Sequence, residues 1–202
     1  EGMEGKKLLG CWAHARRKFF EAKVENEKLA LEALSYIRRL YDVEAEADAL
    51  DAADNKPDHE RRKALRQERA YPEIKKFETW MEASILKCPP KSLMEEAISY
   101  TYKILKKLSL YVTDGRYKID NNMVENSIRP LAIGRKNYLF CGDDDAAQRA
   151  AVVYSLLATC KAHGVNERAW LEDVLRRIPE YEHAGKDYAD LLPANWRALS
   201  AK

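Results

Sequence analysis

Apolar residues at helical spacing run through most of this chain, and they constrain its fold more than any other feature. In the stretch 36–50 they recur at alternating steps of four and three residues: Tyr36, Leu40, Val43, Ala47 and Leu50. This spacing places the apolar side chains on one face of a helix. Only 8 glycines and 7 prolines occur in 202 residues, so few positions interrupt helices. The sequence therefore predicts a mainly helical protein.

A few short strands are also expected, which makes the predicted class mainly α with an α+β core. The candidate segments are residues 6–12, 116–119 and 137–141. The first of them leads into a basic helix from about Ala13. Because one strand and one helix cannot bury a sheet face, we expect partner strands before Glu1, so that this chain is part of a larger domain.

Charge and composition exclude several classes of protein. Lys and Arg number 35 against 33 Asp and Glu, so no global field drives the chain onto nucleic acid or a membrane. No apolar run approaches the roughly 20 residues of a membrane span, and residues 1–7 do not form a secretory signal. Four cysteines without a C-x-x-C pair predict reduced thiols and a cytoplasmic location.

Two neighbouring stretches carry opposite charge. Residues 42–54 contain six acidic and no basic residues, whereas residues 56–76 contain eight basic and four acidic ones. The two stretches either pair as an antiparallel helical hairpin across a turn at 55–57 or form two solvated faces. We prefer solvated faces, because exposed ion pairs contribute little to stability.

Capping residues and prolines predict where several helices begin and end. Ser92 is expected to cap a helix, with Glu95 completing a capping box. A helix capped at 143–145 is expected to run to His163, and the last helix is expected to end at Pro179. Pro130 disfavours helical geometry at the residue before it, which predicts a brief or kinked helix there.

The block 120–136 carries the most informative chemistry. Glu125 stands at a predicted helix start and is followed by three basic residues, Arg129, Arg135 and Lys136. A carboxylate suits a hard divalent cation and arginines suit phosphate oxygens, so the combination fits phosphoryl chemistry on a nucleic acid.

A structural interpretation of the same block stays open. With Asn122 as the helix cap, Glu125 completes a capping box and Arg129, one turn later, neutralises it. One glutamate is also too little for a two-metal site, and the nearby Asp114 and Asp120 have ordinary turn and capping explanations. Cys11 and His14 have a C-x-x-H spacing without a second pair, so we expect them to pack rather than to bind zinc.

Several blocks of the chain together resemble the C-terminal half of transposases of the insertion sequence 66 family. They are residues 10–19 (from Gly-Cys-Trp-Ala-His to Arg-Arg-Lys-Phe), 120–122, Glu125, 128–130, 133–140, 148–151, 154–156 and 191–196. The resemblance implies a ribonuclease-H-like fold in which an Asp-Asp-Glu triad binds two divalent ions, Mg²⁺ or Mn²⁺. Glu125 matches the family glutamate. The two aspartates precede the block 10–19 in such proteins, and residues 1–9 contain no aspartate.

The same resemblance implies DNA cleavage and strand transfer by the whole transposase, with this chain alone inactive. Its implied phosphate contacts are Arg129, Arg135 and Lys136, with a second basic patch at His14, Arg16, Arg17 and Lys18. The implied partners are the element ends and target DNA, a second copy of the chain and accessory transposition proteins, with no membrane and with association to the bacterial nucleoid.

The resemblance also suggests a division of the chain into four parts. Residues 1–24 hold the last core strand and the basic helix, 25–90 a helical insertion, 91–142 the return to the core with the glutamate, and 143–202 the C-terminal helices and tail. The alternative function is a non-catalytic helical module that binds DNA or a partner protein through the acidic and basic hairpin.

Overall fold

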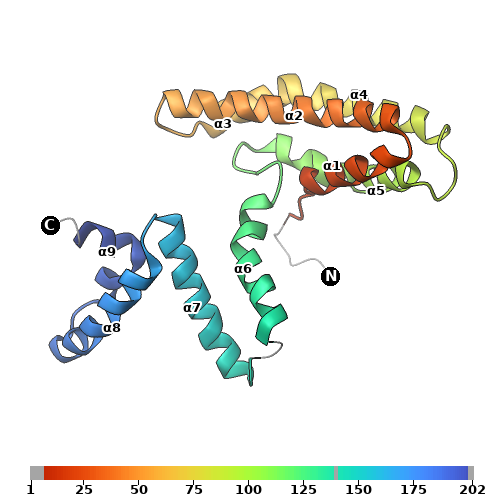
Figure 1. The fold of residues 1–202 in the computed structure, drawn as a ribbon. Helices are drawn as coiled ribbons and strands as arrows, with labels where there is room; N and C mark the ends of the chain where they lie inside the picture. Colours follow the sequence, from red (N-terminus) through yellow and green to blue (C-terminus); the bar gives the residue numbers. More distant parts are fainter. Residues whose placement is uncertain (1–6, 139–140, 200–202) are drawn as a thin grey trace. The chain divides into compact units, whose positions relative to one another are not determined.

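The computed structural model describes residues 7–138 and 141–199, and within these two ranges all regular elements are helices (Figure 1). In chain order they are α1 (Trp12–Glu21), η1 (Ala22–Val24), α2 (Glu27–Ala53), α3 (His59–Leu65), η2 (Arg66–Ala70), α4 (Tyr71–Ile85), α5 (Leu93–Ser109), η3 (Leu110–Thr113), α6 (Asn122–Tyr138), α7 (Asp144–Ala162), α8 (Glu167–Ala184), η4 (Tyr188–Leu191) and α9 (Pro193–Leu199). The prediction of a mainly helical protein is confirmed.

The predicted short strands are not present in the described residues. Residues 7–11 have no regular structure and Trp12 already begins α1, while residues 116–119 form turns and bends. Residues 137 and 138 end α6, and residues 139 and 140 of the third predicted strand, like Lys6 of the first, lie outside the described ranges. A strand needs neighbouring strands to satisfy its backbone groups, and here the backbone of Gly10 bonds instead to the end of a helix, the carbonyl of Lys107. The expected ribonuclease-H-like core is therefore not seen in these residues.

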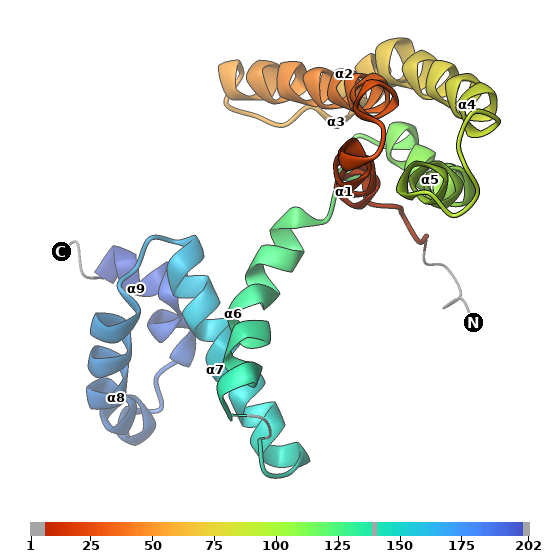
Figure 2. The ribbon, with the colours of Figure 1, turned by 45° about the vertical axis from the view of Figure 1, so that its right-hand side comes forward.

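The contacts divide the chain into two compact units, Glu1–Asn122 and Met123–Lys202. In the first unit α1, α2, α4 and α5 pack in a closed ring, because α1 contacts α5 and α2, and α4 contacts the same two helices. Figure 2 shows α2 and α4 side by side in one layer, with α1 and α5 in the other. The apolar stripe of α2 faces this core, where Leu40 and Val43 are buried.

An aromatic cluster fills the centre of the first unit. The ring of Phe77 stacks on Tyr36 with centroids 5.3 Å apart and on Trp80 at 5.6 Å. Phe19 meets the same ring edge-on at 5.7 Å, and Trp12 lies at 6.2 Å. Aromatic pairs of this geometry contribute about 0.5–1.5 kcal/mol each beyond their buried area, so α1, α2 and α4 are held together at this point.

A buried ion-pair network joins the acidic and basic stretches. Glu44 on α2 is 7% exposed and accepts hydrogen bonds from Arg66, at 2.7 Å, and from Arg62, at 3.1 Å. Arg62 also pairs with Asp48 and Asp51. The two stretches thus form the paired hairpin, and our preference for two solvated faces is wrong. Periodicity shows only that one helix face is charged, whereas burial of that face depends on how α3 and η2 pack against α2.

The second unit is built around Trp170. Its ring nitrogen donates to the Leu191 carbonyl at 2.9 Å, and Cys160, Val174 and Tyr181 are buried with it. The caps that the sequence predicts here are confirmed, because the side chains of Asp143 and Asn166 accept bonds from the first turns of α7 and α8. In the first unit Ser92 caps α5 as predicted, accepting from the backbone of Glu95.

Two prolines lie inside helices where the sequence predicts interruptions. Pro130 is within α6, which runs unbroken over 17 residues, and Pro179 is within α8, which ends five residues later at Ala184. The helix at Pro130 is therefore not brief, a kink there stays a prediction, and the prediction that Pro179 closes its helix is wrong. A proline removes one backbone hydrogen bond at a cost of about 3 kcal/mol, and the turns on either side of it supply the remaining bonds. Gly185, in the left-handed conformation at φ 59°, ends α8 instead.

The four cysteines are free thiols, as predicted. None of the helices in the described parts of the chain combines the length and the apolar character that crossing a membrane requires. The division into the four parts 1–24, 25–90, 91–142 and 143–202 stays a prediction.

Candidate functional site

The segment that leads into α6, residues 119–122, is hydrogen-bonded to the start of α1. The backbone nitrogen of Trp12 donates to the Ile119 carbonyl at 3.2 Å, and the backbone nitrogen of Asn121 donates to Cys11 Sγ at 3.4 Å. Trp12 is also anchored through its ring nitrogen, which donates to the Leu108 carbonyl at 3.1 Å. The sequence blocks 10–19 and 120–122 therefore meet in space, although about 100 residues separate them.

Asp120 organises this meeting point. Its carboxylate accepts the phenolic proton of Tyr41 at 2.9 Å and the backbone and side-chain nitrogens of Asn122 at 3.1 and 3.0 Å. Burial of the phenol and its bond to Asp120 raise the pKa of Tyr41 well above its ordinary range, so the hydroxyl stays a donor. Asp120, for which the sequence predicts a capping role, thus supplies the side-chain oxygen at the start of α6, in place of the Asn122 cap of the structural interpretation.

Glu125 lies in the first turn of α6 and is half-buried. A carboxylate is favoured at this end of a helix, because the first backbone amides leave partial positive charge there. The predicted capping role and the predicted metal-binding role both need a carboxylate at this position, and the helix start by itself does not distinguish them.

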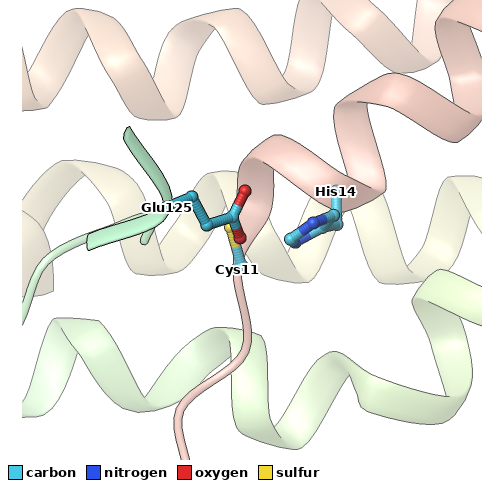
Figure 3. Close-up of side chains that lie close together, drawn as sticks. All are labelled: Cys11, His14 and Glu125. Carbon is cyan, nitrogen blue, oxygen red and sulfur yellow. The ribbon is translucent and has the colours of Figure 1, made fainter. Parts of the chain in front are cut away.

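Cys11 and His14 lie close together at the start of α1. Cys11 immediately precedes α1, His14 is in its first turn, and the thiol sulfur lies within 4.8 Å of a ring nitrogen of His14. Figure 3 draws both side chains, together with Glu125, which belongs to α6. Both are half-buried, and a thiol beside an imidazole is a donor pair that zinc accepts, although the sequence offers no second pair at this spacing.

The predicted basic patch on α1 is exposed in part. Arg16 and Arg17 point to solvent, whereas Lys18 is half-buried with its ammonium 5.6 Å from the centre of the Tyr100 ring. The two arginines are therefore available for phosphate contacts, and Lys18 is partly engaged in a cation–π contact.

The predicted phosphate contacts on α6 are all exposed. Arg129 is four residues after Glu125, and Lys136 is seven residues after Arg129. At this helical spacing the three side chains lie on the same face of α6. Arg135 lies beside Lys136 in the last turn. Arg129 also lines a shallow hollow with Lys161 of α7. One face of α6 thus presents a carboxylate at its first turn and cations behind it.

Sequence reasoning did not identify Tyr41 as part of this region. Tyr41 lies 79 residues before its partner Asp120, and it falls within an ordinary apolar pattern of α2. The sequence predicts only an ordinary helix-capping role for Asp120, and one of its three hydrogen bonds depends on Tyr41, a neighbour that no local pattern reveals.

Comparison with known protein families gives two matches. Residues 3–149 match the family model described as transposase IS66 family, and residues 155–194 match the one described as IS66 C-terminal element. The two matched regions together cover most of the chain.

Curated relatives from Sinorhizobium fredii (strain NBRC 101917 / NGR234) give the same result. The uncharacterized protein y4qI is 38% identical over 192 residues, which are 94% of this chain and 34% of the relative. The uncharacterized protein y4hP is 33% identical over 204 residues, 95% of this chain and 35% of the relative. The chain thus spans about a third of the length of the curated relatives that it matches. No solved structure matches it.

Proposed function

The chain belongs to the IS66 transposase family, and on that premise we propose that it contributes to the cleavage and strand transfer of DNA by supplying one metal-binding carboxylate, Glu125. The observation that carries this proposal is the position of Glu125 within the matched region, in the first turn of a helix whose entry segment is fastened to the start of α1.

The chemistry of Glu125 fits a hard divalent cation such as Mg²⁺ or Mn²⁺, which prefers oxygen ligands. The neighbouring Asp120 is less suited to the same task, because it accepts three hydrogen bonds from Tyr41 and Asn122. Two-metal hydrolysis needs several carboxylates, and the proposal therefore takes the other two from aspartates that family resemblance places before residue 10. When bound, the cations would generate the attacking nucleophile and stabilise the leaving oxygen.

The cationic side chains have a separate task in this proposal. Arg129, Arg135 and Lys136 on α6, and Arg16 and Arg17 on α1, would bind phosphate oxygens and fix the position of the DNA without reading its sequence. His14 and Lys18 would add to the second group. A second copy of the chain and accessory transposition proteins stay predicted partners.

The alternative function, a binding module that works through the charged hairpin, is not favoured by the contacts within it. The charges that would attract a partner, Glu44, Arg62 and Arg66 among them, are buried and pair with each other. A surface whose charges are already neutralised attracts a charged partner only weakly.

A chimeric protein tests the role of Glu125. In it these 202 residues replace the matching third of y4qI, and transposition of a marked element is measured in bacteria. Glu125→Gln is expected to abolish transposition while binding of element-end DNA persists, because the substitution removes a ligand charge and keeps the shape of the side chain. Glu180→Gln, at an exposed position on α8, is the matched control and should transpose normally.

Two outcomes would contradict this proposal. One is normal transposition by the Glu125→Gln chimera when the protein level is unchanged. The other is efficient DNA cleavage by the 202-residue chain alone with Mg²⁺ or Mn²⁺, since a single carboxylate should give no cleavage above background.

A further inference from the structure

A cavity of about 640 Å³ lies between α1 and α2 in the first unit. It is lined by Ala13 and Arg16 of α1, by a row of residues on one side of α2, and by Asn122. The α2 residues are Leu31, Leu34, Ser35, Arg38 and Tyr41. The cavity is open to solvent, and its volume is within the range of sites that bind a small molecule.

Two arginines give the cavity its charge. Arg16 and Arg38 are both exposed, one from each helix, and no carboxylate is among the lining residues. Within the part of the chain that the structure describes, neither guanidinium is in an ion pair, whereas the next residue on α2, Arg39, pairs with Glu73 at 2.6 Å. The positive charge of this cavity is therefore available to an anion.

The remaining lining is mostly apolar. Leu31 is 49% exposed, Leu34 is half-buried, and Ala13 and the Tyr41 ring complete the wall. The cavity thus combines an anion-binding rim with an apolar surface large enough for a flat ring. A nucleotide matches both features. Its phosphate can accept two hydrogen bonds from an arginine, and its base can pack on apolar or aromatic side chains.

Two lining residues of the cavity take part in the entry to α6. Asn122 is on its rim and opens α6, three residues before Glu125, and Tyr41 in its wall holds Asp120. In a duplex the bases are stacked inside and unavailable to such a wall, so the fitting occupant is an unpaired nucleotide.

We propose that this cavity binds one unpaired nucleotide of a DNA strand, with Arg16 and Arg38 on its phosphate and Leu31 and Leu34 against its base. The proposal rests on the proposed function for the identity of its ligand, DNA. It assigns a DNA contact to Arg38 and the leucines of α2, a helix whose sequence shows only an ordinary amphipathic pattern.

Fluorescence anisotropy with the 202-residue chain tests this. The probes are a labelled oligothymidylate and a labelled duplex of the same length at low salt. The single strand is expected to bind more tightly than the duplex, and Arg38→Ala should weaken its binding about tenfold, the effect of losing roughly 1.4 kcal/mol. Leu31→Gln, which keeps helix propensity, should weaken single-strand binding and leave duplex binding unchanged.

Lys103→Ala is the matched control, because it removes one charge from an exposed position on α5, outside the cavity. It should reduce affinity by less than about twofold, the size of a screened surface charge effect. Circular dichroism verifies that each variant keeps its helix content. Equal losses in Arg38→Ala and Lys103→Ala, equal affinity for both probes, or no DNA binding at all would overturn the proposal.

The two experiments separate this proposal from the proposed function. The anisotropy experiment leaves Glu125 unchanged, and the transposition experiment leaves the cavity residues unchanged. A failed metal role at Glu125 would therefore appear only in transposition, and a failed nucleotide site only in the anisotropy experiment.

Discussion

Arg66 and Glu44 form a buried, bidentate ion pair. Arg66 Nε lies 2.7 Å from one carboxylate oxygen of Glu44 and Nη2 lies 2.7 Å from the other, and Arg66 is fully buried. The same guanidinium donates to the carbonyls of Tyr111 and Asp114 at 2.9 and 2.8 Å. One side chain at the short π-helical turn η2 therefore joins α2 to the segment after α5.

Glu44→Gln is expected to destabilise the first unit by about 3–5 kcal/mol, because it leaves Arg66 and Arg62 buried with reduced compensation. Urea denaturation followed by circular dichroism measures the change. Glu46→Gln is the control, since Glu46 pairs with Arg69 on the surface and its loss should cost about 0–1 kcal/mol. Similar losses in both variants would show that burial of the network has no energetic consequence.

Asp51 makes the stability of the helical hairpin depend on pH. Its pKa lies well below its usual range, mainly because Arg62 donates to the carboxylate and next because the backbone of Asp58 does. A carboxyl group whose pKa falls on folding stabilises the protein above its unfolded value, about 4, and loses that contribution as the pH falls toward the folded value.

We therefore expect the urea midpoint of the original chain to decrease below about pH 4. Asp51→Asn should have a lower urea midpoint at neutral pH, and its midpoint should change less as the pH falls. Asp42→Asn, at an exposed position of the same helix outside the network, should keep the original profile. A midpoint of Asp51→Asn that follows the original at every pH would refute the assignment.

The bond between Tyr41 and Asp120 is predicted to order the entry to α6. Tyr41→Phe should cost about 1 kcal/mol and should increase amide hydrogen exchange in residues 119–122. Tyr102→Phe removes a comparable bond to Glu82, 2.8 Å long but exposed, and should change neither quantity measurably. If residues 119–122 exchange at the same rate in Tyr41→Phe and in the original chain, this bond does not order them.

Gly10 allows the segment before α1 to approach α5 closely. A Cβ atom at this position would lie 2.9 Å from the backbone nitrogen of Leu108, which is too close for a real contact, so Gly10→Ala should cost about 1–3 kcal/mol. The emission of Trp12, whose ring nitrogen bonds to the Leu108 carbonyl, should also shift. Leu8→Ala, at a 70% exposed position, should change stability by less than about 0.5 kcal/mol. If Gly10→Ala is as stable as the original chain, the close contact between the segment before α1 and α5 does not require glycine.

Local patterns were sufficient for the helices and their caps. The apolar stripe of α2 and the caps at Ser92, Asp143 and Asn166 follow from residue types within one or two turns of chain. These properties are determined by short-range spacing and by hydrogen bonds between residues three or four apart, which any reader of the sequence can assess.

The strands and the prolines show where such patterns are insufficient. A short apolar run such as 6–12 is compatible with a strand only if other strands pair with it, and in the described residues its backbone meets the end of α5 instead. Pro130 and Pro179 are tolerated inside α6 and α8. The free energy lost with one backbone hydrogen bond is smaller than the stabilisation that the other hydrogen bonds of the helix provide.

The sequence by itself determined that the chain is helical, where most helices begin, and which blocks carry the family resemblance. Only the tertiary structure decided that the hairpin charges are buried, that Asp120 holds Tyr41, and that Arg16 and Arg38 share one cavity. The physical reason is that burial and pairing depend on contacts between residues far apart in the chain, and neither periodicity nor composition records which faces of two helices meet.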